Sequence, residues 1–319
     1  MATAEQIKSL VKAYADCNDE KFKTVVLQIA AHEAKLGHDN LARDLKKQID
    51  RVGSKRANIV QLTSTNPMLT LSMPSHDLSE LIVSEDISDK IQRILNEYRN
   101  RNKLVSYGLT NRRKILIEGN PGTGKTLTAS IIASELSLPL YTVQMDKLVT
   151  KFMGETSAKL RQIFDSIEST VGVYLFDEFD AIGADRSFDN EVGEMRRILN
   201  SFLQFIEQDD SESIIVAATN NQKLLDQALF RRFDDVLHYT LPTSKEIKRL
   251  FEYKIKSYDN HFMISEEIVN FAEGLSHAEI ARVCDDARKN SLLSDEPITS
   301  KAVIALLSER QYVYTCKEA

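Results

Sequence analysis

The chain has 319 residues, of which 42% are hydrophobic and 28% charged, and its 47 acidic residues outnumber 41 lysines and arginines. This composition is typical of a folded globular protein of roughly two domains and argues against a disordered chain. The formal net charge of −6 disfavours nucleic acid as a partner, because sequence-independent binding to its phosphates needs an excess of positive charge.

The three cysteines are an odd number and show no CxxC spacing. This argues against a disulfide framework or a zinc ribbon and fits a reducing compartment. The first residues lack a basic segment followed by an apolar one, and no apolar run is long enough to span a bilayer. We therefore expect a cytoplasmic protein that makes no contact with a membrane.

Apolar residues recur at helical spacing in residues 7–14, 22–30 and 41–49. The short loops between these segments predict that the helices fold back on one another, as a small all-α bundle over residues 1–52. Residues 53–76 are rich in serine and threonine with two prolines, which predicts a linker. Four apolar residues in its second half indicate that part of it packs on a neighbouring surface: Met68, Leu69, Leu71 and Met73.

Strands and helices are predicted to alternate from residue 77 onward. Apolar strands are expected at residues 114–117, 140–143, 171–176 and 214–218, and helices at 87–98, 125–136, 157–167 and 191–206. Apolar strands joined by crossover helices predict a parallel sheet covered on both faces. After Pro242 only helical periodicity remains. The expected fold class is α/β, with an α/β subdomain at 77–241 and a helical lid at 242–319.

The segment GNPGTGKT fits the pattern G-x-x-x-x-G-K-[ST] between a predicted strand and a predicted helix. Glycines let successive N–H groups point at phosphate oxygens, and a helix N-terminus favours an anion. Lys125 would reach the terminal phosphates, and Thr126 would offer its hydroxyl to Mg²⁺. A simple glycine-rich turn is the alternative, which the strand–loop–helix context disfavours. The predicted nucleotide-binding residues are Gly119, Asn120, Pro121, Gly122, Thr123, Gly124, Lys125 and Thr126.

Two adjacent carboxylates, Asp177 and Glu178, follow the predicted strand of residues 171–176. Ligands of open α/β sheets bind at the carboxyl ends of strands, so these side chains are expected beside the phosphates. Asp177 would hold Mg²⁺, partly through water, and Glu178 would accept a proton from an attacking water. Taken alone, the pair could also be a solvated acidic turn.

Three segments follow one another along the chain: the phosphate loop, residues 176–182 (FDEFDAI) and residues 217–220 (AATN). Together they resemble the AAA clade of the AAA+ ATPases, as in FtsH-like and spastin-like cores, over about residues 77–319. The resemblance implies a P-loop NTPase fold with a helical C-terminal lid, and ATP and Mg²⁺ as cofactors. It also implies that Asn220 contacts the γ-phosphate or the attacking water; alone, Asn220 could equally be a turn residue.

Residues 226–234 (DQALFRRFD) resemble the second homology region of that clade, which carries arginine fingers. Such a finger stabilises charge on the γ-phosphoryl oxygens and is commonly supplied by a neighbouring subunit. The usual spacer between the two arginines is missing here. Arg232, directly before Phe233, is the better candidate and Arg231 the second. Without the resemblance, a surface pair that forms salt bridges would be the simpler interpretation.

Two further segments resemble family elements. Residues 274–280 (GLSHAEI) resemble the start of the sensor-2 helix, with the small Ala278 typical of the clade and His277 where glycine is common. The residues Lys151, Phe152 and Met153 resemble pore loop 1, whose aromatic residue faces the channel of unfolding machines. Phe152 packed beneath its own loop is the alternative. Residues 189–194 would form a second pore loop.

The resemblance implies an ATP-hydrolysing protein remodeller or unfoldase that assembles into a ring, a hexamer in this family, with ATP between subunits. Residues 29–34 (IAAHEA) and 202–210 (FLQFIEQDD) look like a bacterial subgroup encoded beside subtilisin-like serine proteases in anti-phage defence gene pairs. That likeness implies a protein substrate or a partner protease. No Ser-His-Asp or HExxH arrangement indicates a protease in this chain itself.

Two alternatives stay open at the level of sequence. A DNA-processing AAA+ ATPase of the loader type would need basic residues facing the pore, which the acidic total and the aromatic pore loop disfavour. A slow nucleotide-dependent scaffold or switch would use the N-terminal helices as its working part. Turnover measured with and without DNA or unfolded protein separates these functions.

Overall fold

The computed structural model describes residues 66–148, 153–179, 191–220, 230–256 and 258–315, together with residues 25–27, 29, 30, 33 and 43. The chain divides into two compact units, Met1–Thr63 and Ser64–Ala319. The described residues of the first unit are helical, as the periodicity predicts, and the rest of the predicted bundle lies outside the described residues.

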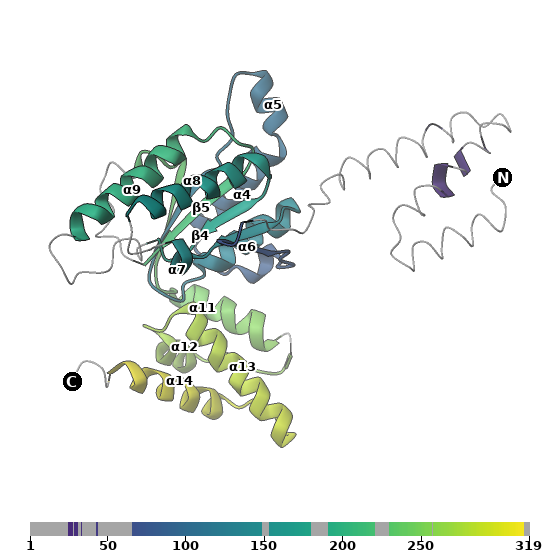
Figure 1. Ribbon diagram of the computed structural model, residues 1–319. Helices are drawn as coiled ribbons and strands as arrows, with labels where there is room; N and C mark the ends of the chain where they lie inside the picture. The colour runs from purple at the N-terminus through teal and green to yellow at the C-terminus, as the bar shows by residue number, and fades with distance from the viewer. Residues whose placement is uncertain are drawn as a thin grey trace. The chain divides into compact units, whose positions relative to one another are not determined.

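The described part of the second unit is built around a six-stranded sheet with the strand order β1-β3-β4-β5-β2-β6 (Figure 1). The strands are β1 (Leu69–Ser72), β2 (Lys114–Gly119), β3 (Leu140–Val143), β4 (Val173–Phe176), β5 (Ile214–Thr219) and β6 (Asp235–Tyr239). Neighbouring strands are parallel, except that β1 pairs antiparallel with β3 at one edge. The predicted parallel sheet is confirmed, with two edge strands that the sequence pattern does not predict.

The edge strand β1 lies inside the segment predicted as a linker, residues 53–76. Leu69 pairs with Val143 and Ser72 with Leu140. Met68 and Leu69 are buried against the sheet's core. Met68, Leu69 and Leu71 therefore pack with the sheet, whereas Met73 follows β1 and is 67% exposed. Residues 53–65 lie outside the described residues.

Helices cover both faces of the sheet. On one face, α8 (Met153–Ser169) and α9 (Glu191–Gln208) pack against the side chains of Leu116 and Phe176. On the other, α4 (Glu85–Arg99) and α6 (Lys125–Leu136) pack against Ile115 and Ile117. The described part of the subdomain also contains three shorter helices: η1 (Leu78–Glu80), α5 (Arg101–Ser106) and α7 (Met145–Leu148).

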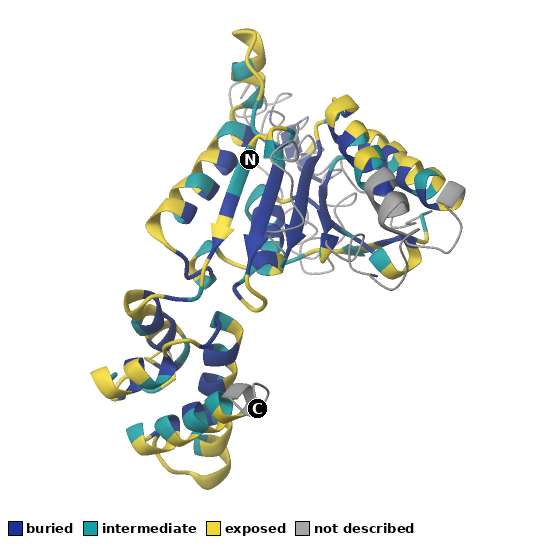
Figure 2. Cartoon of the chain, turned by 90° about the vertical axis from the view of Figure 1, so that its left-hand side faces the viewer, coloured by how far each residue is buried: buried dark blue, intermediate teal, exposed yellow. Residues whose placement is uncertain are grey.

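Burial on both faces explains why the inner strands read as continuous apolar runs. All six residues of β5 and all four of β4 are buried. Figure 2 shows these strands in dark blue throughout, whereas the helices expose their outer sides to solvent. This is the pattern from which the strands were predicted.

The C-terminal helices form the expected lid, which Figure 1 shows gathered below the sheet. They are α11 (Ser244–Phe251), a π-helical segment η4 (Glu252–Lys256), α12 (Glu266–Ala272), α13 (His277–Ser294) and α14 (Ser300–Thr315). The lid has a hydrophobic core of its own, which Ile82 from the segment before α4 enters. Among the described helices, none is both long and apolar enough to cross a membrane.

Candidate functional site

The segment GNPGTGKT lies between β2 and α6: Gly119 ends the strand and Lys125 begins the helix. Strand β5 lies beside β2, and β4 lies beside β5, all parallel. Asp177 and Asn220 each follow the last residue of their strand, so both come to the same edge of the sheet as the phosphate loop. This is the edge at which open α/β sheets bind ligands.

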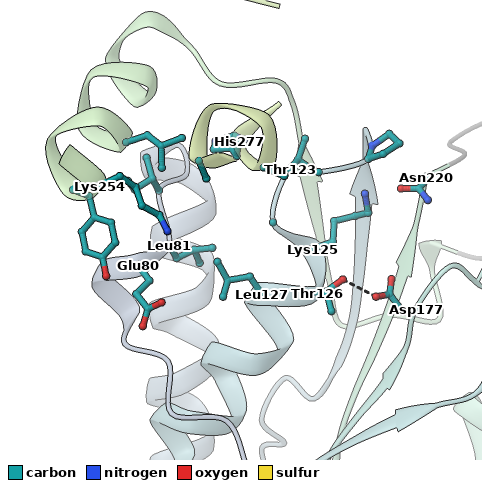
Figure 3. A pocket seen from close by; sticks show the side chains of 18 of the residues that line it. Glu80, Leu81, Thr123, Lys125, Thr126, Leu127, Asp177, Asn220, Lys254 and His277 are labelled. Carbon is teal, nitrogen blue, oxygen red and sulfur yellow. Dashed lines mark hydrogen bonds between the residues drawn. The ribbon is translucent and has the colours of Figure 1, made fainter. Parts of the chain in front are cut away.

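A pocket of about 410 Å³ opens at this edge between the sheet and the lid (Figure 3). Figure 3 shows Thr126, Asp177 and Asn220 at one side of the pocket, and Glu80 and Lys254 at the other. The second side is lined largely by residues from the start of the unit and from the lid: Leu81, Ile82, Leu250, Tyr253, His277, Ala278 and Ala281. A pocket with a phosphate loop on one side and mostly apolar side chains on the other suits a nucleoside triphosphate.

The two residues that end the phosphate-loop motif are held by short hydrogen bonds. Lys125 Nζ donates to the main-chain carbonyls of Gly119 and Asn120, each at 2.8 Å. Thr126 Oγ1 donates to Asp177 Oδ2 at 2.6 Å. A hydroxyl and a carboxylate in contact are the oxygen donors that Mg²⁺ prefers, so Thr126 and Asp177 fit a magnesium site.

Glu178 lines the pocket next to Asp177. Its main-chain N–H donates to Asp177 Oδ1 at 2.9 Å, and its φ of 51° is a left-handed conformation. That conformation is uncommon for a residue other than glycine, and strained backbone of this kind clusters at functional sites. Phe179, the next residue, is buried against Phe202 of α9, which holds the turn in place.

His277 lines the pocket as the first residue of α13, behind the N-cap Ser276. Both ring nitrogens are buried, and neither makes a hydrogen bond of good geometry in the described part of the chain. Burial lowers the pKa of His277, while the carboxylate of Glu246 and the nearby main chain of Ile82 act in the opposite direction. The imidazole is therefore held neutral at the lid side of the pocket.

The arginine pair is placed at the other end of β2 from the phosphate loop. Arg231 and Arg232 lie in a turn before β6, where Asp234 Oδ2 accepts hydrogen bonds from the N–H groups of Arg113 and Lys114, each at 2.9 Å. Lys114 begins β2 and Gly119 ends it, so the two ends are about 17 Å apart. Neither arginine lines the pocket of its own chain.

The two arginines differ in their surroundings. Arg231 is exposed, whereas Arg232 is partly buried and forms an ion pair with Glu207 of α9 at 2.8 Å. An ion pair of this exposure contributes roughly 0–1 kcal/mol, which a phosphate easily outcompetes. Both side chains are therefore available to a ligand that approaches this turn.

The expected pore loops fall mostly outside the described residues. This holds for Lys151 and Phe152, and for residues 189 and 190. Met153 begins α8, and residues 191–194 form the first turn of α9. The sequence pattern therefore predicts these loops, and the described backbone only shows the helices that follow them.

Comparisons with known proteins identify the family of the chain. The model of a family described as "ATPase family associated with various cellular activities (AAA)" matches residues 115–241. A protein of Sinorhizobium fredii named an uncharacterized AAA family ATPase is 34% identical over 303 residues, which is 92% of this chain and 90% of that protein.

Two relatives with functional names are similar over shorter stretches. The proteasome-activating nucleotidase of Sulfurisphaera tokodaii is 29% identical over 277 residues, 78% of this chain and 70% of its own. The ATP-dependent zinc metalloprotease FtsH of Parabacteroides distasonis is 31% identical over 211 residues. That stretch is 63% of this chain and only 31% of the metalloprotease.

A phosphate loop at the carboxyl edge of a parallel sheet, closed over by a helical lid, defines a P-loop nucleoside triphosphatase. The 34% identity with the Sinorhizobium protein, over 90% of that protein's length, identifies the family within this class. The chain belongs to the AAA family of ATPases, and it binds and hydrolyses ATP.

Proposed function

We propose that this ATPase is a protein remodeller that works as a ring, a hexamer, with each ATP bound between two subunits. The observation that carries the proposal is the position of the arginine turn, at the far end of β2 from the pocket of the same chain. No arginine is among the described residues that line the pocket. A second copy that presents Arg231 and Arg232 would supply the missing positive charge, and such head-to-tail contacts close into a ring.

Within each pocket the residues of this chain take distinct roles. The phosphate loop would bind the triphosphate through its N–H groups and through Lys125, and Asn220 would orient the attacking water. Glu178 would accept the proton that this water loses as its oxygen attacks the γ-phosphorus and ADP leaves. Thr126 and Asp177 would hold Mg²⁺, which supplies neutralising charge for the phosphate oxygens.

Protein is the proposed substrate because two relatives carry names that connect them with proteolysis, the proteasome-activating nucleotidase and the metalloprotease FtsH. The segment Lys151, Phe152 and Met153 would then grip a polypeptide in the channel of the ring, with Phe152 as the aromatic contact. Hydrolysis would move the lid against the sheet and shift this loop, so that ATP turnover pulls on the chain.

The partner that we propose is a subtilisin-like serine protease in a bacterial anti-phage defence pair. The proposal is supported by the likeness of residues 29–34 and 202–210 to that subgroup. The ATPase would deliver substrate to the protease or control it. A ring of Glu178→Gln subunits, stalled with ATP bound, should co-purify with this protease from the native host, and its absence from such a ring would contradict the pairing.

The experiment that tests remodelling measures ATP turnover and substrate unfolding on the same variant. Phe152→Ala should leave basal hydrolysis within a few-fold of wild type, and substrate processing should fall much further, because this side chain takes no part in phosphate chemistry. Met263→Ala, an exposed apolar residue of the lid, serves as the control for truncation alone. If Phe152→Ala processes the protein substrate as fast as wild type, the polypeptide is not gripped by this side chain in the channel. That result would favour a slow nucleotide-dependent switch. Stimulation by DNA in place of unfolded protein would favour a DNA loader.

A further inference from the structure

Two charged side chains line the nucleotide pocket at the end that is remote from the phosphate loop. Glu80 is the last residue of η1, and Lys254 lies in the π-helical segment η4 of the lid. Figure 3 shows both on the side opposite Thr126 and Asp177, with Lys254 extending from the lid toward Leu81. Because the triphosphate binds at the phosphate loop, the base and ribose of the nucleotide lie at this other end.

The carboxylate of Glu80 is held in one orientation. Its Oε1 accepts a hydrogen bond of 2.9 Å from the main-chain N–H of Asp77, and its Oε2 lies 3.1 Å from His76 Nδ1. The N–H of Asp77 is the main cause that the pKa of Glu80 lies below its ordinary value, and His76 and Lys254 add to this effect against a weaker effect of burial. The side chain is 30% exposed. An ionised carboxylate has about four acceptor positions, so this fixed group can still accept hydrogen bonds from a ligand.

Two other polar side chains line this end among the described residues, Tyr253 and His277. The ring nitrogens of His277 are buried by the surrounding protein, so a ligand cannot reach them. Tyr253 belongs to the same π-helical segment as Lys254. Segments of this kind are rare and occur frequently at functional sites. The charged groups that a nucleoside meets here are therefore the carboxylate of Glu80 and the ammonium of Lys254.

A hydrogen-bond acceptor and a hydrogen-bond donor in one apolar pocket match the edge of adenine. The 6-amino group of adenine donates hydrogen bonds, and the ring nitrogens N1 and N7 on either side of it accept them. A 6-oxo purine presents an acceptor at the same position, which would face the carboxylate of Glu80 without a proton between them. A pocket discriminates strongly when the wrong ligand leaves its polar groups unpaired, so these two side chains can select the base.

We propose that Glu80 and Lys254 determine the base preference of this ATPase. The carboxylate of Glu80 accepts a hydrogen bond from the 6-amino group of adenine, and the ammonium of Lys254 donates one to a ring nitrogen beside that group. The apolar side chains around them, Leu81 and Leu250 among them, exclude water from these contacts. The inference concerns the pocket of one chain, so it stands or falls independently of the proposed ring.

Binding of ATP and of inosine triphosphate, whose base carries an oxygen at position 6, tests the role of Glu80. Titration calorimetry on the full chain with Glu178→Gln should give a Kd for ATP about ten-fold below that for inosine triphosphate. Glu80→Gln can still accept from the N–H of Asp77 but offers an amide N–H to the 6-oxo group, so this preference should vanish or reverse. Glu266→Gln is the matched control, because Glu266 pairs with Lys248 on the lid and neither residue lines the pocket. A parent without the preference, or a Glu80→Gln chain that keeps it, would overturn the proposal.

Analogues of ATP that lack one ring nitrogen test the role of Lys254 and do not depend on how Glu80→Gln folds. The parent should bind either 1-deaza-ATP or 7-deaza-ATP about ten-fold more weakly than ATP, because the ammonium then has no acceptor. Lys254→Met should bind ATP and both analogues alike, whereas the control Lys248→Met should respond like the parent. Equal loss in the parent and in Lys254→Met, or no loss in the parent, would overturn the role of Lys254. If Glu80→Gln instead changes the ratio of affinities for ATP and 2′-deoxy-ATP, the carboxylate binds the ribose, which overturns base selection.

Discussion

The main-chain N–H of Ala278 donates a hydrogen bond of 2.9 Å to the main-chain carbonyl of Gly122. This bond joins the first turn of the lid helix α13 to the middle of the phosphate loop. Gly122 has a φ of +74°, and a Cβ added to it would lie 2.6 Å from Ser276 Oγ. Ser276 is buried and caps α13 together with Glu279, so it cannot readily move aside. The start of lid helix α13 and the phosphate loop are therefore coupled directly at this contact.

Gly122→Ala is expected to disrupt this contact and with it nucleotide binding. The added methyl group collides with Ser276 and also strains a backbone conformation that only glycine adopts at low cost. Differential scanning fluorimetry should show a lowered Tm and little or no rise when ATP is added.

Gly274→Ala is the matched control for this variant. Gly274 also has a positive φ, of +85°, but nothing lies within 4 Å of the position of an added Cβ. It should therefore suffer only the backbone cost, about 1–2 kcal/mol, and keep its response to ATP. Equal ATP responses of the two variants would show that the contact with Ser276 is unimportant.

Lys125→Ala and Glu178→Gln are expected to separate binding from hydrolysis. Loss of the Lys125 ammonium removes the main positive charge for the phosphates, so the rise of Tm with ATP should disappear.

Glu178→Gln keeps the shape of the turn but removes the proton acceptor, so this variant should bind ATP and hydrolyse it at least a hundred-fold more slowly. A Glu178→Gln chain that hydrolyses ATP at the wild-type rate would rule this residue out.

The sequence predicts the inner sheet well because burial on both faces leaves an unmistakable apolar run in β4 and β5. The phosphate loop is predicted from its own pattern, since the glycines and Lys125 form one continuous segment. The edge strands are harder to predict. β1 has four residues, of which Leu69 alone is buried, and β6 alternates between core and solvent without a long apolar run.

The site residues that the sequence pattern misses come from segments far apart in the chain. Leu81 and Ile82 come from the segment before α4 and Tyr253 comes from the lid, and no local pattern marks them as neighbours in one pocket. The sequence marks position 277 only because histidine stands where glycine is common in the family. That its ring is held neutral follows from its burial in the structure.

Arg231→Ala and Arg232→Ala should each lower turnover at least ten-fold while leaving affinity for ATP nearly unchanged, because neither lines the pocket of its own chain. Mixing either variant with Lys125→Ala subunits should restore activity, because an intact arginine turn then meets an intact pocket. Mixed rings that stay inactive would contradict supply between subunits.

Stability should depend on pH through His277. Burial lowers the pKa of His277 below its ordinary value of 6.5, so just below pH 6.5 the unfolded chain binds this proton more readily than the folded chain. Stability therefore rises with pH across this window and is lost as the pH falls below about 6.5. The Tm of wild type should fall between pH 7.5 and 5.5 by more than that of His277→Gln, in which the other histidines remain. Parallel curves would show that this ring does not titrate on unfolding.

The edge strand β1 has a mechanical consequence for the chain that enters it. Asn66 Nδ2 donates to Ser166 Oγ of α8 at 3.2 Å, and the N–H of Gln144, just after β3, donates to the carbonyl of Met68 at 2.9 Å. Tension applied through the residues before Asn66 is therefore carried first by β3 and α8, ahead of the phosphate loop. Helix α7 follows β3 directly and ends just before residues 149–152, and α8 begins just after them, so the load reaches the elements on both sides of the segment that carries Phe152.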